Sequence, residues 1–153
     1  ERLSPGDALY VPAGVPHSYV SGTGVEVMTT SDNVVRLGLT PKEVNIDEAL
    51  AVLRQDREPV VLRGGQRLHP AGAPFSVELL EAGEQTMDSG AYRLVLAVQE
   101  DLRVGAGDGP TNGVSVPLGS ALVATAAEPA LTVRTPGIAA LVRHEQSCMS
   151  NQA

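Results

Sequence analysis

Residues 6–17 read GDALYVPAGVPH, a pattern that predicts a strand, a tight turn and a histidine directly after the turn. The apolar run Ala8–Val11 is typical of a buried strand, and Pro12 and Gly14 force the chain to turn. Rigid neighbours then hold His17 in place, which a metal ligand requires. A histidine after a turn is also an ordinary surface residue, so the spacing alone leaves both interpretations open.

Composition favours a mainly β, globular chain. The 153 residues are 42% hydrophobic and 19% charged, with sixteen glycines and eleven prolines, which indicate many turns. A net charge of -7 argues against nucleic-acid binding, although a few local cations could still bind an anionic sugar phosphate. Cys148 is the only cysteine, and no segment is typical of a signal peptide or a membrane span. We therefore expect no disulfide, no membrane partner and a cytoplasmic setting.

The pattern along the chain predicts two β-units. In the first, residues 1–55, we expect a hairpin of Asp7–Pro12 and His17–Val20 and a strand at Val25–Thr30. A loop at Val34–Lys42 should then cross the open end of a β-barrel. It ends in a helix near 45–55, capped by Asn45, whose apolar face should pack outside a barrel.

A connector at 56–74, with one short strand at Val60–Leu62, joins a second β-unit at 75–144, and a polar tail covers 145–153. Within the second unit we expect strands at 75–80, 92–98, 102–105, 113–116, 120–124, 130–134 and 138–143.

One segment of the second unit, residues 119–130, resembles residues 6–17 in sequence. Aligned on residues 6–17, the segment 119–130 keeps the glycine and the apolar strand but has Thr125, Ala127 and Ala130 where the first has Pro12, Gly14 and His17. A methyl group cannot bind a metal, so any metal centre should belong to the first unit. A chance recurrence of a glycine before a strand explains the echo equally well.

Two segments resemble a known family. Gly6, Pro12, Gly14 and His17 match the second motif of the cupin β-barrels, although Ser21 stands where that motif often has Asn. The following stretch, residues 26–42 (EVMTTSDNVVRLGLTPK), closely resembles the signature of the type I phosphomannose isomerases. The resemblance is strong over residues 1 to about 55 and weak beyond. It implies part of a cupin-type (jelly-roll) barrel with one short helix, and a second, degenerate cupin-like unit without metal ligands.

The resemblance also implies a reaction and a metal. Such enzymes interconvert mannose 6-phosphate and fructose 6-phosphate, moving a proton between C2 and C1 through an enediol. His17 would be one zinc ligand, with a Gln, a His and a Glu supplied upstream of this chain. The chain begins at Glu1 in a turn, so we expect a C-terminal fragment that needs the upstream part of its own chain and has little activity alone.

Four further residues are candidates for the site. The resemblance places Arg36 in catalysis and makes Lys42 a phosphate contact. Glu26 is our candidate acid or base: its strand pattern allows either an interior or an outer position, and the resemblance favours the pocket. Tyr19 would share a face with His17 and bind substrate hydroxyls, or it is an ordinary tyrosine at the edge of the core.

Other interpretations stay open. Asp32 could replace Glu26 as the base, or it and Asn33 could simply shape a turn. The main alternative to an isomerase is a non-catalytic cupin module that binds a sugar or a metal. A cupin enzyme of another chemistry would need a second histidine near the first, and the sequence offers none.

Overall fold

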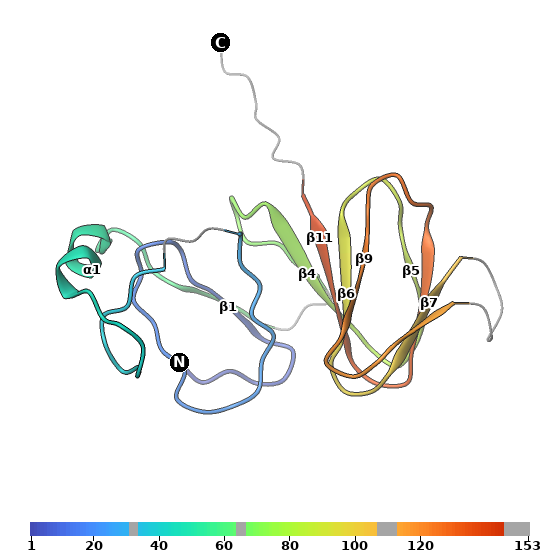
Figure 1. The fold of residues 1–153 in the computed structure, drawn as a ribbon, viewed down its shortest axis with the longest axis horizontal. Helices are drawn as coiled ribbons and strands as arrows, with labels where there is room; N and C mark the ends of the chain where they lie inside the picture. Colours follow the sequence, from blue (N-terminus) through green and yellow to red (C-terminus); the bar gives the residue numbers. More distant parts are fainter. Residues whose placement is uncertain (31–33, 64–66, 107–112, 146–153) are drawn as a thin grey trace, which may run out of the picture. The chain divides into compact units, whose positions relative to one another are not determined.

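The chain folds as two compact units, Glu1–Arg63 and Gly64–Ala153 (Figure 1). The computed structural model describes residues 1–30, 34–63, 67–106 and 113–145, so the predictions for Asp32, Asn33, Cys148 and the tail after Glu145 lie outside the described residues. The chain is mainly β with one short helix, as predicted. Within the described ranges, no helix is long and apolar enough to cross a membrane.

The first unit holds a two-stranded sheet that differs from the predicted hairpin. Strand β1, Ala8–Tyr10, pairs antiparallel with β2, Val60–Leu62, with Leu9 opposite Val61. The predicted strands at His17–Val20 and Val25–Thr30 are wrong, because neither segment is a strand. A strand is stable only when a neighbour pairs its backbone groups, and the described part of the chain provides none beside these two segments.

The helix α1, Ile46–Val52, begins where its capping signal predicts. The Asn45 side chain accepts a hydrogen bond from the Glu48 amide at 3.2 Å, and acidic residues in the first turn suit the positive end of the helix dipole. The predicted packing of its apolar face is wrong for this chain. Ala49 is buried, but Ile46 and Leu50 are 56% and 59% exposed, because no sheet described in this unit covers them.

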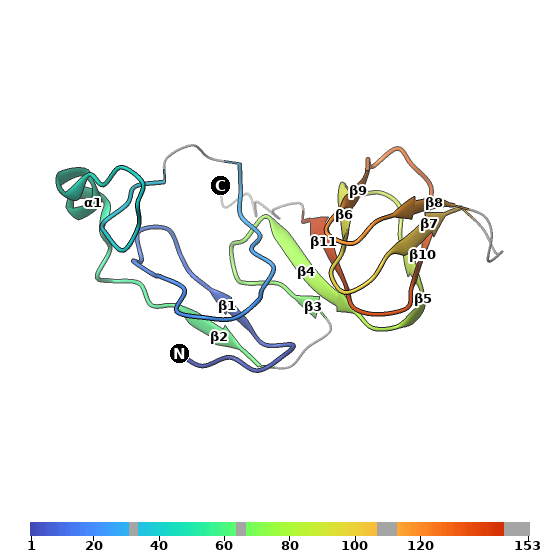
Figure 2. The ribbon, with the colours of Figure 1, turned by 60° about the horizontal axis from the view of Figure 1, so that its bottom comes forward.

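The second unit is a sandwich of two antiparallel sheets that face one another (Figures 1 and 2). One sheet has the order β5-β10-β7-β8 and the other β3-β4-β11-β6-β9. Side chains from both sheets fill one hydrophobic core, which includes Leu80, Val95 and Val133. The strands are β3 Arg67–Leu68, β4 Phe75–Leu80, β5 Gly83–Met87, β6 Arg93–Ala97, β7 Leu102–Gly105, β8 Val114–Val116, β9 Ala121–Ala124, β10 Leu131–Thr135 and β11 Ala139–His144.

The similarity between residues 6–17 and 119–130 extends to the backbone geometry of the turns that precede β1 and β9. Ahead of β1, the Asp7 amide donates to the Ser4 carbonyl at 3.0 Å, and Gly6 has a φ of 86°. Ahead of β9, the Ser120 amide donates to Pro117 at 2.9 Å, and Gly119 has a φ of 76°. Both glycines occupy the third turn position, where a positive φ favours glycine. The two strands are thus entered through the same kind of turn.

The turns after the strands also correspond. The Val15 amide donates to Pro12 at 3.2 Å, and at the aligned positions the Glu128 amide donates to Thr125 at 3.3 Å. The first turn contains proline and Gly14, which fix its shape locally. The second contains neither, although the Thr125 amide also donates to the Glu128 carboxylate at 2.6 Å.

A buried arginine holds the second turn. Arg93 at the start of β6 is fully buried, and its guanidinium donates only to main-chain carbonyls. Three of these carbonyl groups belong to the second turn and the residue after it. The Arg93 side chain, from a distant strand, therefore stabilises in the second turn the backbone shape that proline and glycine stabilise in the first. The acceptors are Met87 at 3.1 Å, Asp88 at 2.5 Å, Thr125 at 2.8 Å, Glu128 at 3.1 Å and Pro129 at 3.2 Å.

Candidate functional site

The turn that carries His17 requires glycine at position 14 for two reasons. Gly14 has a φ of 85°, which side chains rarely adopt. A Cβ there would also lie 2.5 Å from Cγ of Arg54 and 2.8 Å from the Val52 carbonyl oxygen. The chain leaving α1 comes this close because the Arg54 amide donates to the Gly14 carbonyl at 2.9 Å. The segment after the helix therefore fastens the turn, a role that no local sequence signal could predict across forty residues.

His17 is exposed, and its ring is oriented by its own turn. Nδ1 lies 3.2 Å from the Val15 carbonyl oxygen. Since a carbonyl can only accept, Nδ1 must be the donor in this contact, and in the neutral ring the lone pair of Nε2 is then free. Metal-binding histidines commonly have this arrangement, in which the second nitrogen is held by a main-chain carbonyl.

Tyr19 connects His17 to Glu26. The Tyr19 hydroxyl donates to Oε1 of Glu26 at 3.0 Å, and its ring meets the His17 ring edge-on, with the centroids 6.1 Å apart. Partial burial, then the hydrogen bond to Glu26 and its negative charge, raise the pKa of Tyr19. The structure thus brings together three of the five candidates, which we call the His17 cluster: His17, Tyr19 and Glu26.

The other two candidates lie apart from this cluster. The Arg36 carbonyl accepts from the Asn45 amide at 3.2 Å, and the Lys42 amide donates to the Thr40 hydroxyl at 3.2 Å. Among the described residues, no hydrogen bond or ion pair joins either side chain to the His17 cluster. Glu26 is exposed in this chain, and its position in a pocket stays a prediction.

The donor set does not make a complete metal centre. The part of the chain that the structure describes contains no group of three or more His, Cys, Asp or Glu residues that could hold a metal ion. A zinc site normally takes at least three protein ligands. His17 therefore offers a single, well-oriented donor, and the chain by itself does not fit a bound zinc ion.

The chain, mainly β with a turn-held histidine after Gly6, Pro12 and Gly14, has a cupin-type fold. Solved structures support this fold: phosphomannose isomerase of Salmonella typhimurium, bound to fructose 6-phosphate and zinc, matches with a TM-score of 0.54 at 22% identity over 78% of this chain and 32% of the enzyme. Variants of that enzyme with one histidine, glutamate or arginine replaced by alanine match in the same way. No family model matches the chain.

Sequence relatives are mannose-6-phosphate isomerases. That of Salmonella typhimurium is 31% identical over an alignment of 142 positions, and the match covers 72% of this chain and 35% of the enzyme. That of Escherichia coli is 33% identical over an alignment of 110 positions, and the match covers 65% of this chain and 28% of the enzyme. Over most of its length the chain is similar to the mannose-6-phosphate isomerases, in line with the predicted resemblance, and it spans about a third of the length of these relatives.

Proposed function

We propose that the chain forms part of an enzyme that interconverts mannose 6-phosphate and fructose 6-phosphate. The reaction moves a proton between C2 and C1 of the sugar through an enediol. The Salmonella relative whose structure contains fructose 6-phosphate and zinc supports this substrate class.

The spacing of three residues in this chain indicates which of them take part in the proposed reaction. The histidine, glutamate and arginine replaced in the Salmonella variants are separated by nine and ten residues, in that order along the chain. His17, Glu26 and Arg36 have the same order and the same two separations. We infer that these three residues are the counterparts of the three that were substituted there.

The residues of this chain have distinct tasks in the proposed reaction. Glu26 transfers the proton between the two carbons, and the Tyr19 hydroxyl that donates to it holds its carboxylate in one orientation. Arg36 stabilises negative charge on the enediol oxygens, since a guanidinium presents several donors in fixed geometry. Lys42 binds the phosphate as a point charge. For Arg36 and Lys42 to act with the His17 cluster, the loop that carries them must close over the sugar.

Zinc would bind only with help from outside this chain. We propose that Nε2 of His17 supplies one ligand and that upstream residues of the parent protein supply the others. Because the residues present do not form a centre, we assign no step of the reaction to the metal.

The surface of the first unit supports a larger parent protein. Of the seventeen exposed large hydrophobic side chains among the described residues, thirteen lie in residues 3–60. Val20 and Leu39 are 97% and 95% exposed. Exposed apolar area on this scale is typical of a surface that another part of a protein covers. We propose that upstream strands of the parent barrel cover it and pair with the extended segments around His17.

A chimera tests the function directly. In it, this chain replaces the matching segment of the Salmonella isomerase, and fructose 6-phosphate formation is followed in a coupled assay. We expect turnover by the chimera and little by the isolated chain. Arg36→Ala should reduce kcat by roughly a hundredfold with zinc content unchanged, as expected for loss of one donor to a developing oxyanion.

Arg57→Ala is the matched control, because Arg57 is an exposed arginine outside the site. A folded, zinc-loaded chimera without turnover would contradict the isomerase proposal. If that inactive chimera still bound fructose 6-phosphate, the result would favour the alternative function, a non-catalytic module that binds a sugar.

A further inference from the structure

The outer face of the β5-β10-β7-β8 sheet carries a row of polar side chains that the isomerase reaction does not use. Pairing registers place Glu84, Arg134, Arg103 and Ser115 side by side on four successive strands. Register partners point to the same face of a sheet. The neighbours of the two arginines along their strands, such as Leu102 and Val133, are buried, so the row points away from the core.

This row brings two positive charges together, and among the described residues only Arg134 forms an ion pair with a carboxylate. Arg134 donates from Nε to Glu84 at 2.7 Å. Arg103 makes no hydrogen bond or ion pair with any residue that the structure describes. Like charges directly opposite each other on neighbouring strands are unfavourable. An anion that reached both guanidiniums would remove that repulsion.

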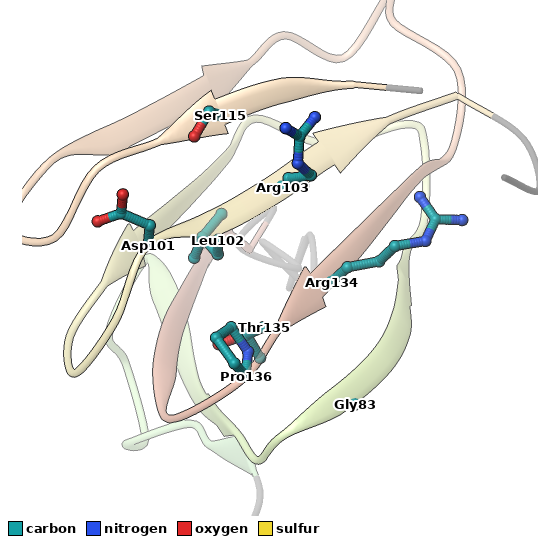
Figure 3. Close-up of a pocket in the computed structure, with 8 residues that line it drawn as sticks. All are labelled: Gly83, Asp101, Leu102, Arg103, Ser115, Arg134, Thr135 and Pro136. Carbon is teal, nitrogen blue, oxygen red and sulfur yellow. The ribbon is translucent and has the colours of Figure 1, made fainter. Parts of the chain in front are cut away.

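The row borders an open cavity of about 360 Å³ (Figure 3). Figure 3 shows Arg103, Ser115 and Arg134 lining it from adjacent strands. Gly83 also lines it and contributes no side chain. Asp101 also lines the cavity, but its Oδ1 accepts from the Leu118 amide at 2.8 Å and is committed to that loop. The volume is in the range of small-ligand sites.

We propose that this cavity binds a small phosphorylated compound through its phosphate group. Arg103 supplies the main contact, because a guanidinium fits two phosphate oxygens at once and no carboxylate in the described ranges forms an ion pair with this one. The Ser115 hydroxyl is a second donor, and Arg134 adds charge while remaining paired with Glu84. The site lies entirely in the second unit and shares no residue with the His17 cluster, so it does not depend on the isomerase proposal.

Two-dimensional amide NMR of the whole chain tests the site with inorganic phosphate at constant ionic strength. We expect saturable shifts near Arg103 and Ser115, with a dissociation constant of roughly 1 mM. Arg103→Ala should weaken binding roughly tenfold, the loss expected for one charge-assisted hydrogen bond. Asp101→Asn should tighten it, because the amide keeps an acceptor for Leu118 but removes the negative charge. Arg57→Ala, which removes an exposed arginine of the first unit, should change nothing at these amides.

Several results would overturn the proposal: shifts that grow linearly with phosphate, unchanged binding by Arg103→Ala, or no tightening by Asp101→Asn. Each spectrum also shows whether its variant is folded, and Asp101→Asn probes the cavity with both arginines present. Acetate at the same ionic strength should bind more weakly, since it carries a single charge and only two oxygens. Equal binding of acetate would exclude a phosphate-selective site.

Discussion

Replacing Arg93 by methionine should destabilise the second unit more than any exposed substitution. The change removes a buried guanidinium that donates to five carbonyl groups, while a side chain of similar length still fills most of its volume. The loss therefore reports on the hydrogen bonds more than on a cavity.

The magnitude follows from two opposing terms. Hydrogen bonds to a charged group contribute about 1.5 to 3 kcal/mol each, but burying the guanidinium costs several kcal/mol of hydration. Each buried carbonyl left without its donor costs about 1 to 3 kcal/mol, so the loss of five such bonds, offset by the hydration regained, should total about 3 to 5 kcal/mol. For a unit of Gly64–Ala153, that loss corresponds to a fall in Tm of roughly 12 °C or more.

Urea unfolding followed by circular dichroism measures this loss. Arg103→Met in phosphate-free buffer is the matched control, because it makes the same chemical change on an exposed residue of a neighbouring sheet and should cost less than about 0.5 kcal/mol. Arg93→Lys should fall between the two, since an ammonium has three donors for five carbonyls. If Arg93→Met is no less stable than Arg103→Met, the guanidinium is not what holds the turn.

Three further predictions concern single groups. Gly14→Ala should destabilise the first unit by about 1 to 3 kcal/mol in urea, through its positive φ and the close Arg54 side chain, whereas Gly24→Ala, which meets nothing within 4 Å, should be near neutral. Hydrogen bonds from Ser76 and Arg67 lower the pKa of Glu145, so this carboxylate stabilises the fold above its unfolded pKa of 4.5, and the stability advantage over Glu145→Gln should disappear as the pH falls through the lowered value. Glu26→Gln should move the raised pKa of Tyr19 part of the way back to 10.0 in an ultraviolet titration, and an unchanged value would mean that burial alone raises it.

The second unit was the easier to predict from sequence because its strands bury alternate side chains. Leu102–Gly105 shows that alternation in its residues, and Arg93–Ala97 is an apolar run after its arginine; the predicted strands at both places match the structure closely. Strand β5, Gly83–Met87, was missed because only Met87 is buried in it. Its pairing with β10 defines it, and pairing between distant residues leaves no local pattern.

The first unit was predicted less well for the same physical reason. The segments around His17 and Glu26 have strand-like residues, but a strand forms only where a partner satisfies its backbone. The helix start at Asn45 was predictable, since a cap depends on residues three apart.

Part of the candidate site was also within reach of sequence. The proximity of Tyr19 to His17 follows from their separation of two residues, whereas the hydrogen bond from Tyr19 to Glu26 depends on how the intervening loop folds back. The contact of the Arg54 segment with Gly14 spans forty residues and had no signal at all.

The two aligned turns differ in when they can form during folding. The turn at Pro12–Val15 carries its own conformational preferences, so it should be populated even in a short peptide and order early. The turn at Thr125–Glu128 depends on a side chain more than thirty residues away, so it can order only after β6 has docked. Hydrogen exchange of the Glu128 amide should therefore report the global opening of the sandwich, while the Val15 amide exchanges through local fluctuations. One backbone shape is thus encoded by neighbours in one unit and by tertiary structure in the other.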